Sequence, residues 1–317
     1  MTNNNSLFGG SDMMGVCYAP YHQAATVKKS SYTKENVAAD LKIISANNMT
    51  FIRTYTVQGC QKYLPELCKK NNIGLALGVW IFQKDSKSTN AEIDTALTQA
   101  NAHPEMVKVI VIGNEVDLAI NKYTVAEVKA AFDYAVAQLK LPKYSNITNV
   151  PLTICMTGAG PTNATWSPLL NIMQSYAFLT IYPWYGQKGN HESNPIKFPM
   201  TPGEITGNMQ YSYENGMKQA IAAGLEVVIA EIGWPSHGDI NAHTTWKDEV
   251  TNFNATCKWI NGTNTYNKAF ITMWFEMFDE PWKTAEGLWG PHWGIYGSGI
   301  SPTIKTDKSK TPFTKCS

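Results

Sequence analysis

Short apolar runs recur along the chain, separated by polar stretches that carry helix signals. Because the runs are continuous rather than alternating, they favour strands covered on both faces, as in a parallel sheet. Strands that alternate with helices in this way are the sequence form of repeated β/α units. We count eight runs, at residues 14–20, 50–57, 73–82, 106–116, 151–160, 177–186, 225–235 and 269–278.

Three of the intervening segments show helix signals most clearly. Residues 124–140 begin with a capping box of Thr124 and Glu127, and their apolar residues repeat on one face. The other two are residues 33–48, with Thr33 as a candidate N-cap, and residues 210–223, followed by Gly224 as a candidate C-cap.

Eight strand and helix pairs match a closed β/α barrel, which typically has about 250 residues. A doubly wound open sheet would normally have a glycine-rich turn after its first strand, whereas residues 17–21 read CYAPY. Length alone would allow two domains, but no segment is left over for a second one. We therefore predict an α/β protein, a single-domain (β/α)8 TIM barrel over residues 13–317, after a flexible segment at residues 1–12.

Charge and composition exclude several kinds of partner. The net charge is +1 without a long basic run, so we expect no nucleic-acid partner, and no run of 18 apolar residues predicts a membrane span. The 10 Trp and 15 Tyr exceed what a barrel core usually needs, and such rings stack on the flat faces of sugars. We expect a monomer that binds a neutral ligand.

Cysteines and histidines show no metal or redox spacing. The six Cys lack CxxC pairs and the six His lack HExxH, so we expect neither a metal nor a cofactor.

The opening residues lack an export signal, which fits either a cytosolic protein or a mature form that was exported. Glycosylation sequons favour a secreted or cell-wall protein, although a chain rich in Asn and Thr has some by chance; they lie at Asn4, Asn48, Asn146, Asn163, Asn254 and Asn261.

Two carboxylates lie where barrel chemistry is expected, at the carboxyl ends of strands. Glu115 ends the fourth run and Glu231 lies near the end of the seventh. Burying a carboxylate there is costly unless it is paired, so each Glu forms either a strand-end ion pair or part of an active site. Acetal hydrolysis uses a pair of carboxyl groups, one of which acts as acid while the other attacks the sugar carbon.

At these residues the chain resembles glycoside hydrolase family 17, whose members act on β-1,3-glucan through a retaining mechanism on a β/α barrel. The resemblance spans nearly the whole chain. Its motifs are GVCY (15–18), RTY (53–55), VIGNEV (111–116), IYPW (181–184), AEIGWPS (230–236) and FEMFDEPWK (275–283).

The resemblance implies a role for each matching residue. Glu115 is expected to be the acid/base, Glu231 the nucleophile, and Asn114 the donor to the sugar 2-hydroxyl, a hydrogen bond that strengthens in the transition state. Tyr182 is expected to hydrogen bond the nucleophile, and Tyr55 to lie in the same mouth. Two roles remain open for four further matching residues. They either form a polar network that tunes the pKa values of the two carboxylates or have a purely structural role; they are Tyr18, Arg53, Glu280 and Lys283.

The loop after the eighth run departs from the plant members. A glutamate that they carry at a fixed distance after the lysine has no clear equivalent here, so Glu286 is left out of the catalytic set. The Trp-rich loop is closer to the fungal members, which favours a β-1,3-glucanosyltransferase over an endo-β-1,3-glucanase. A noncatalytic glucan-binding wall protein is the remaining alternative. Candidate aromatic platforms for the acceptor sugar are Trp184, Trp282, Trp289 and Trp293.

Overall fold

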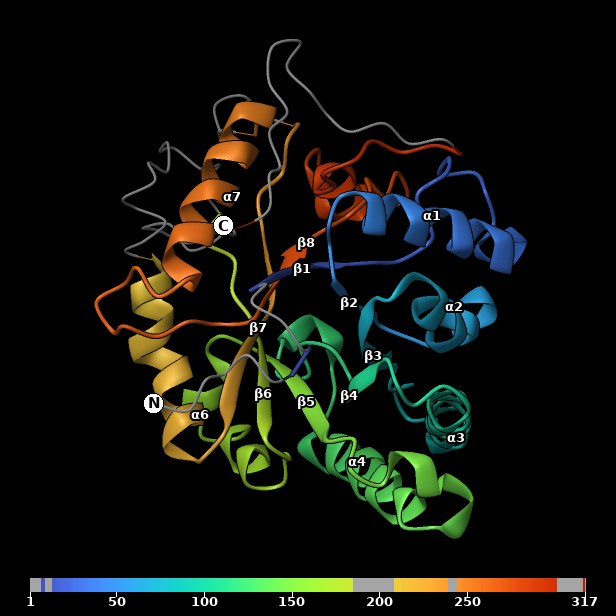
Figure 1. Cartoon of the computed structure of the whole chain (residues 1–317). Coiled ribbons are helices and arrows are strands. Elements are labelled where there is room, and N and C mark those ends of the chain that lie inside the picture. The colour runs from blue at the N-terminus through green and yellow to red at the C-terminus, as the bar shows by residue number, and fades with distance from the viewer. Residues whose placement is uncertain (1–6, 9–12, 185–207, 239–243, 301–315, 317) are drawn as a thin grey trace.

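The computed structural model describes residues 7–8, 13–184, 208–238, 244–300 and 316. Its parallel strands close into a barrel in chain order, with β8 hydrogen-bonded to β1 (Figure 1), which confirms the predicted (β/α)8 fold. The strands are β1 Met14–Cys17, β2 Phe51–Arg53, β3 Gly74–Val79, β4 Val107–Ile112, β5 Leu152–Thr157, β6 Tyr176–Thr180, β7 Glu226–Gly233 and β8 Thr272–Phe275.

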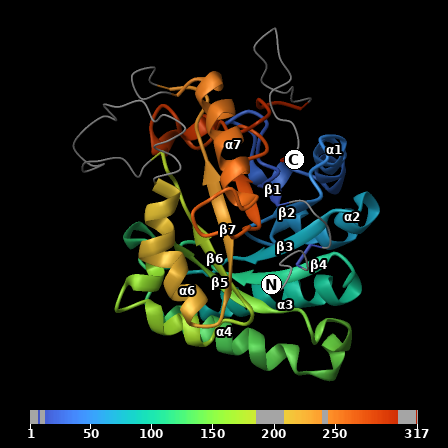
Figure 2. The same cartoon turned by 60° about the vertical axis from the view of Figure 1, so that its left-hand side comes forward.

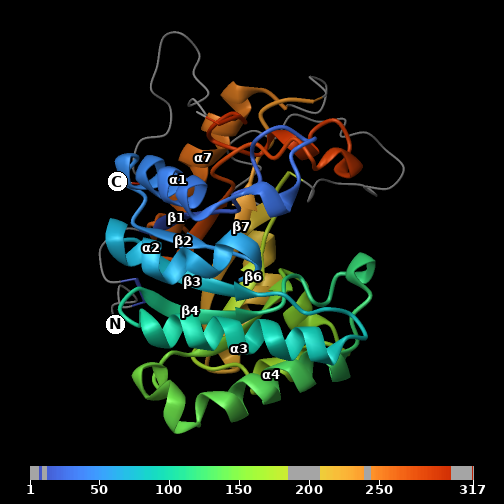
Figure 3. The same ribbon diagram turned by 90° about the vertical axis from the view of Figure 1, so that its right-hand side faces the viewer.

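Helices cover the outside of the barrel. Figure 3 shows α1 to α4 following one another around one side, and Figure 2 shows α6 and α7 on the side of β6 and β7. Because both faces of each strand are thus covered, nearly every strand residue is buried, as the continuous apolar runs indicated. The helices are α1 Lys34–Ala46, α2 Leu64–Asn71, α3 Ser86–Ala102, α4 Val125–Leu139, α6 Lys218–Ala222 and α7 Trp246–Ile260.

The predicted caps are present. Thr33 and Thr124 both form capping boxes, the latter with Glu127, and Gly224 has the left-handed φ of +85° expected after a helix. The predicted helix at residues 210–223 contains a π-helical turn, Tyr213–Met217. Its Gly216 lies so close to the backbone of Gly158 that a Cβ would clash there.

Two predicted helices are replaced by short 3-10 turns. After β5 the described chain forms turns at Gly160–Thr162 and Ser167–Asn171, and after β8 at Thr284–Glu286 and Gly290–His292. Pro161 and three further prolines in these loops explain the difference, because proline is compatible only with the first turn of a helix.

The strands are shorter than the apolar runs, mainly at their carboxyl ends. The run at residues 50–57, for example, contains only Phe51–Arg53 as strand. The residues beyond each strand form the loops of the carboxyl rim, where the catalytic groups of such barrels lie. These loops position the candidate site.

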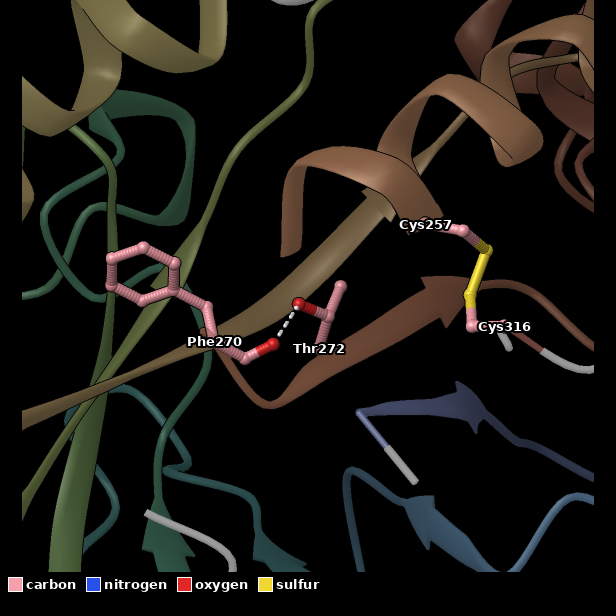
Figure 4. Close-up of a disulfide and its surroundings, with 4 residues drawn as sticks. All are labelled: Cys257, Phe270, Thr272 and Cys316. Atoms are coloured by element: carbon pink, nitrogen blue, oxygen red, sulfur yellow. Dashed lines mark hydrogen bonds between the residues drawn. A yellow bond between two sulfur atoms is a disulfide. The ribbon is translucent and has the colours of Figure 1, made fainter. Parts of the chain in front are cut away.

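The chain ends are only partly described. Residues 1–6 and 9–12 of the predicted N-terminal segment lie outside the described residues, whereas Leu7 is buried and Phe8 stacks on Phe51 with ring centroids 4.2 Å apart. Near the C-terminus, Cys257 of α7 forms a disulfide with Cys316 (Figure 4). Within the described part of the chain, no helix is long and apolar enough to cross a membrane.

Candidate active site

Glu231 lies in β7 with both carboxylate oxygens bonded. Oε1 accepts a hydrogen bond from Arg53 Nη1 at 2.5 Å, and Oε2 accepts one from the Tyr182 hydroxyl at 2.5 Å. Its side chain is buried beside Thr180 of β6, with which it is in register. Two hydrogen bonds, one of them from a cation, hold this carboxyl group in a fixed orientation.

Arg53 bonds both Glu231 and Asn114, the residue that precedes Glu115. Its Nη2 donates to Asn114 Oδ1 at 2.6 Å, and its guanidinium lies 4.7 Å from the ring centre of Tyr55. The register pairs Arg53 with Ala76 of β3, and residues two apart on a strand share a face, so Gly78 lies on this face too. At Gly78 a Cβ would clash with the backbone of Thr54, so the close approach of this segment to β3 requires glycine there.

Glu115 reaches the site because the chain turns sharply after β4. Gly113 and Glu115 both have positive φ, +75° and +44°, a conformation that strains any residue except glycine. Asn121 compensates by donating from Nδ2 to the Glu115 carbonyl at 2.9 Å. The carboxyl then accepts a hydrogen bond from Thr180 Oγ1 at 2.7 Å. Backbone strain at a functional residue is typical of active sites.

The protonation behaviour of Glu115 differs from that of an ordinary surface glutamate. Burial, and after it the charge of Glu231, raise the pKa of the Glu115 carboxyl to about 7, against smaller lowering effects from the Thr180 hydroxyl and Arg53. The Glu115 carboxyl can therefore hold a proton near neutral pH. Separate protonation states of two nearby carboxyls are what an acid and nucleophile pair requires.

A second polar cluster lies at the end of β8. Lys283 Nζ is 2.6 Å from Glu280 Oε2, and Trp282 donates from Nε1 to Glu280 Oε1 at 3.2 Å. The Trp282 ring is 40% exposed, and the ammonium of Lys29 lies 4.0 Å from its centre. The predicted residues Glu280, Lys283 and Trp282 thus lie together, with Trp282 at the surface.

Two predicted substrate-binding residues do not face a ligand. Tyr18 is buried and its hydroxyl donates to Asp40 of α1 at 2.7 Å, away from the catalytic pair. Trp184 is fully buried, with its ring 4.9 Å from Trp289 and 5.6 Å from Trp293. Because these rings pack on each other, Trp184 and the equally buried Trp293 are not open stacking platforms. The sequence expectation is corrected on this point.

Sequence reasoning missed Thr180 and Glu276. Thr180 lies two residues before Tyr182. Because side chains alternate along a strand, the sequence could have predicted that both point to the same face. Glu276, within the FEMFDEPWK motif, is buried with its carboxyl oxygens 3.0 and 3.3 Å from Lys283 Nζ, and the sequence carries no signal for that contact. Glu286, left open by the sequence, is exposed in the turn after Lys283.

No arrangement suited to a metal ion occurs among the described side chains, where no three or more His, Cys, Asp or Glu gather in that way. The contacts above therefore describe a site of two carboxyls, one guanidinium and their hydrogen-bond partners.

Two solved structures share the barrel fold of this chain. An endo-laminarinase from Formosa Hel1_33_131 has a TM-score of 0.70, 22% identity, and coverage of 93% of this chain and 86% of that one. CJP38, a β-1,3-glucanase and allergen of Cryptomeria japonica pollen, has a TM-score of 0.66, 18% identity, and coverage of 93% and 98%. At these identities the two structures show a shared fold.

Sequence relatives are longer than this chain. The glucan endo-1,3-β-glucosidase btgC of Emericella nidulans is 23% identical over 92% of this chain and 45% of its own length. The probable β-glucosidase btgE of Aspergillus terreus is 28% identical over 73% of this chain and 37% of its own length. The chain thus spans less than half of either relative.

The family assignment rests on most of the chain. The model of the BtgE/BtgC glycoside hydrolase domain matches residues 15–294, which include Glu115, Glu231 and the cluster after β8. This match confirms the resemblance found in the sequence to β-1,3-glucan-active glycoside hydrolases. The chain belongs to the BtgE/BtgC glycoside hydrolase domain family.

Proposed function

We propose that the chain is a retaining enzyme that acts on β-1,3-glucan through a covalent glycosyl-enzyme intermediate. Glu231 attacks the anomeric carbon while Glu115 protonates the departing oxygen, and Glu115 later acts as base for the incoming acceptor. The single observation that carries this proposal is the placement of the two carboxyls: Glu115 accepts from Thr180, which is in register with Glu231, and the Glu231 oxygens accept from Arg53 and Tyr182. Burial, which raises the pKa of the Glu115 carboxyl to about 7, supports it.

Asn114 supports the same assignment. Its Oδ1 accepts from Arg53, so its NH₂ group is left to donate. An amide donor next to the acid/base fits the 2-hydroxyl of the sugar that Glu231 attacks, where hydrogen bonds strengthen as the oxocarbenium-like state forms. Arg53 would thereby orient both the nucleophile and the sugar-binding amide.

The substrate class is proposed from the relatives. Several of the relatives that the chain matches are named glucan endo-1,3-β-glucosidases, and the two structures above are described as a laminarinase and a β-1,3-glucanase. An exposed Trp282, held by its Nε1 bond to Glu280, offers a ring on which a glucose residue can stack.

Transfer to a second glucan is our proposal for the second half of the reaction, supported by the fungal character of the loop after β8 and by the exposed Trp282. Hydrolysis is the second candidate, because the names of the relatives favour it. The two differ only in whether a sugar hydroxyl or water attacks the intermediate.

The test is incubation with a defined laminari-oligosaccharide, followed by NMR of the first product anomer and by product sizing. A β-anomer with products both longer and shorter than the substrate is expected. An α-anomer would overturn the retaining mechanism, and exclusively shorter products at every concentration would replace transfer by hydrolysis. Glu231→Gln should bind laminarin without turnover; binding with no turnover by the unmutated protein would support a noncatalytic wall protein instead.

We also propose that the protein is exported to the cell surface or wall as a monomer. The Cys257–Cys316 disulfide supports an oxidising compartment, and the sequon residues Asn48, Asn146, Asn163, Asn254 and Asn261 are all exposed. Protein recovered from the medium of its source should carry this disulfide and elute at the mass of one chain. Recovery only from the cytosol would contradict export.

A further inference from the structure

Three ionisable side chains share one buried position at the end of β8. Lys283 Nζ lies 2.6 Å from Glu280 Oε2 and 3.0 Å from Glu276 Oε1, and all three side chains are largely buried. One ammonium and two ionised carboxyls would leave an uncompensated negative charge there, which is costly away from water. The other titratable side chains that interact with this cluster are the Cys17 thiol with Glu276, Glu286 with Lys283, and Lys29 with Glu280, so the charges of Lys29 and Glu286 cancel and the excess of one negative charge remains.

The hydrogen bonds indicate which carboxyl holds a proton. Both Glu280 oxygens are engaged by donors, Oε1 by Trp282 and Oε2 by Lys283. The Glu276 oxygens lie farther from Lys283, at 3.0 and 3.3 Å, and its carboxyl is within hydrogen-bond reach of Glu280. Burial, and then the charge of Glu280, raise the pKa of Glu276 well above its usual value.

This cluster is connected to the nucleophile through aromatic rings. Lys283 Nζ lies 4.2 Å from the ring centre of Phe275, which packs edge-on against Tyr182 at 5.8 Å. Tyr182 in turn donates to Glu231. A displacement of Lys283 would therefore remove the support behind the tyrosine that orients the attacking carboxylate.

The backbone of Glu276 reaches the same tyrosine by a second route. Its N–H donates to the Trp293 carbonyl at 3.0 Å, and the Trp293 ring lies 5.4 Å from that of Tyr182. Phe275 and Trp293, whose rings flank Tyr182, are thus both linked to Glu276. Phe275 is linked through Lys283, and Trp293 through its backbone carbonyl.

We propose that Glu276 is a positioning residue for the reaction, a protonated carboxyl that shares its proton with Glu280 and holds Lys283 against Phe275 so that Tyr182 stays on Glu231. This proposal rests on the proposed function, because its effect is exerted on the nucleophile. It goes beyond that function in giving a neutral, buried carboxyl a role outside the catalytic pair.

The first test is turnover of laminari-oligosaccharide and of a dinitrophenyl β-laminaribioside, whose leaving group needs no acid. Glu276→Ala should lower kcat by about 10- to 100-fold through misplacement of the nucleophile, with a much smaller change in KM. Glu276→Gln, which resembles the protonated acid, should stay within about threefold of wild type. Glu280→Gln should lower kcat more than Glu276→Gln does, because it replaces the carboxylate that accepts from both Lys283 and Trp282.

A matched control is Glu66→Gln. Glu66 also bonds two lysines, Lys34 and Lys70, but lies on the outer helix α2, so its loss should leave turnover unchanged. Unfolding of each variant by urea shows whether it is folded under the assay conditions.

The second test does not need turnover. In the Glu115→Gln background, infrared difference spectra at pH 7 should show a protonated-carboxyl band that disappears in Glu276→Gln. Absence of this band, or a Glu276→Gln variant as slow as Glu276→Ala, would overturn the proposal. If instead the wild-type protein cleaves no β-1,3-glucan while the band is present, the proposed function fails and the shared proton stands.

Discussion

Arg53 and Glu231 form an ion pair at the mouth of the barrel, with Nη1 and Oε1 2.5 Å apart and side chains only 1% and 5% exposed. Arg53 also bonds Asn114, which precedes the acid/base in the chain. A single cation therefore orients both Glu231, the proposed nucleophile, and the amide proposed to bind the sugar.

Removal of this guanidinium should be costly for both folding and catalysis. Arg53→Met leaves a buried carboxylate without its cation, which should lower the free energy of unfolding by about 3–5 kcal/mol. Activity should fall by about 100-fold or more. Arg53→Lys is the matched control, since one ammonium cannot bridge Glu231 and Asn114 and should restore stability better than kcat. Equal activity in all three proteins, measured with urea titrations alongside, would contradict this role.

Thr180 should set the upper pH limit of activity. Its hydroxyl lowers the pKa of Glu115 by bonding the ionised carboxyl, so Thr180→Val should raise that pKa further above 7. Because Glu115 must be protonated for the first step, the basic limb of the profile of kcat/KM against pH should move to higher pH. Thr180→Ser, which keeps the hydroxyl, should retain the wild-type limb. A move to lower pH in Thr180→Val would refute the assignment of Glu115 as the acid.

Glu115 should make the protein less stable as the pH rises. Its folded pKa of about 7 lies above the ordinary value of 4.5, so ionisation is penalised in the folded state. The cost is absent below pH 4 and is complete above pH 7. Glu115→Gln should therefore gain about 3 kcal/mol of unfolding free energy relative to wild type between pH 4 and pH 8. Urea unfolding at several pH values measures this difference; a gain that shrinks with rising pH would have the wrong sign.

The disulfide should stabilise the fold independently of the site. Cys257 and Cys316 are separated by 59 residues, and a loop of that size contributes roughly 4 kcal/mol in the chain-entropy treatment. Cys316→Ser should lower the free energy of unfolding by up to that amount while leaving kcat unchanged. Reductant should destabilise wild type and have little effect on the variant. Equal sensitivity of both proteins to reductant would show that the bond is not formed in solution.

The fold could be predicted because hydrophobic pattern and strand burial are directly related in a parallel barrel. Each predicted run overlaps one strand, as residues 50–57 overlap Phe51–Arg53. Strand ends were placed too far along because rim residues such as Val57 are buried as well, and burial alone does not separate a strand from its following loop. Among the described residues after β5 and β8, prolines keep the chain in short turns where the sequence predicted helices.

The candidate site was only partly predictable. Glu115 and Glu231 were found because a carboxylate at the end of an apolar strand needs a partner. Thr180 was missed because threonine is an ordinary strand residue, and the position of Glu276 depends on Lys283, seven residues later. The burial of Tyr18 and Trp184 could not be predicted because the sequence does not show which way an aromatic ring packs.

The central claim, that Glu231 forms a bond to the sugar while Glu115 supplies the proton, is tested most directly by trapping the intermediate. Glu115→Ala should accumulate a glycosyl-enzyme with a 2-deoxy-2-fluoro dinitrophenyl laminaribioside, since this leaving group needs no acid. Peptide mass spectrometry should find the added sugar on Glu231. A label on any other residue, or rapid turnover without a covalent adduct, would contradict the account.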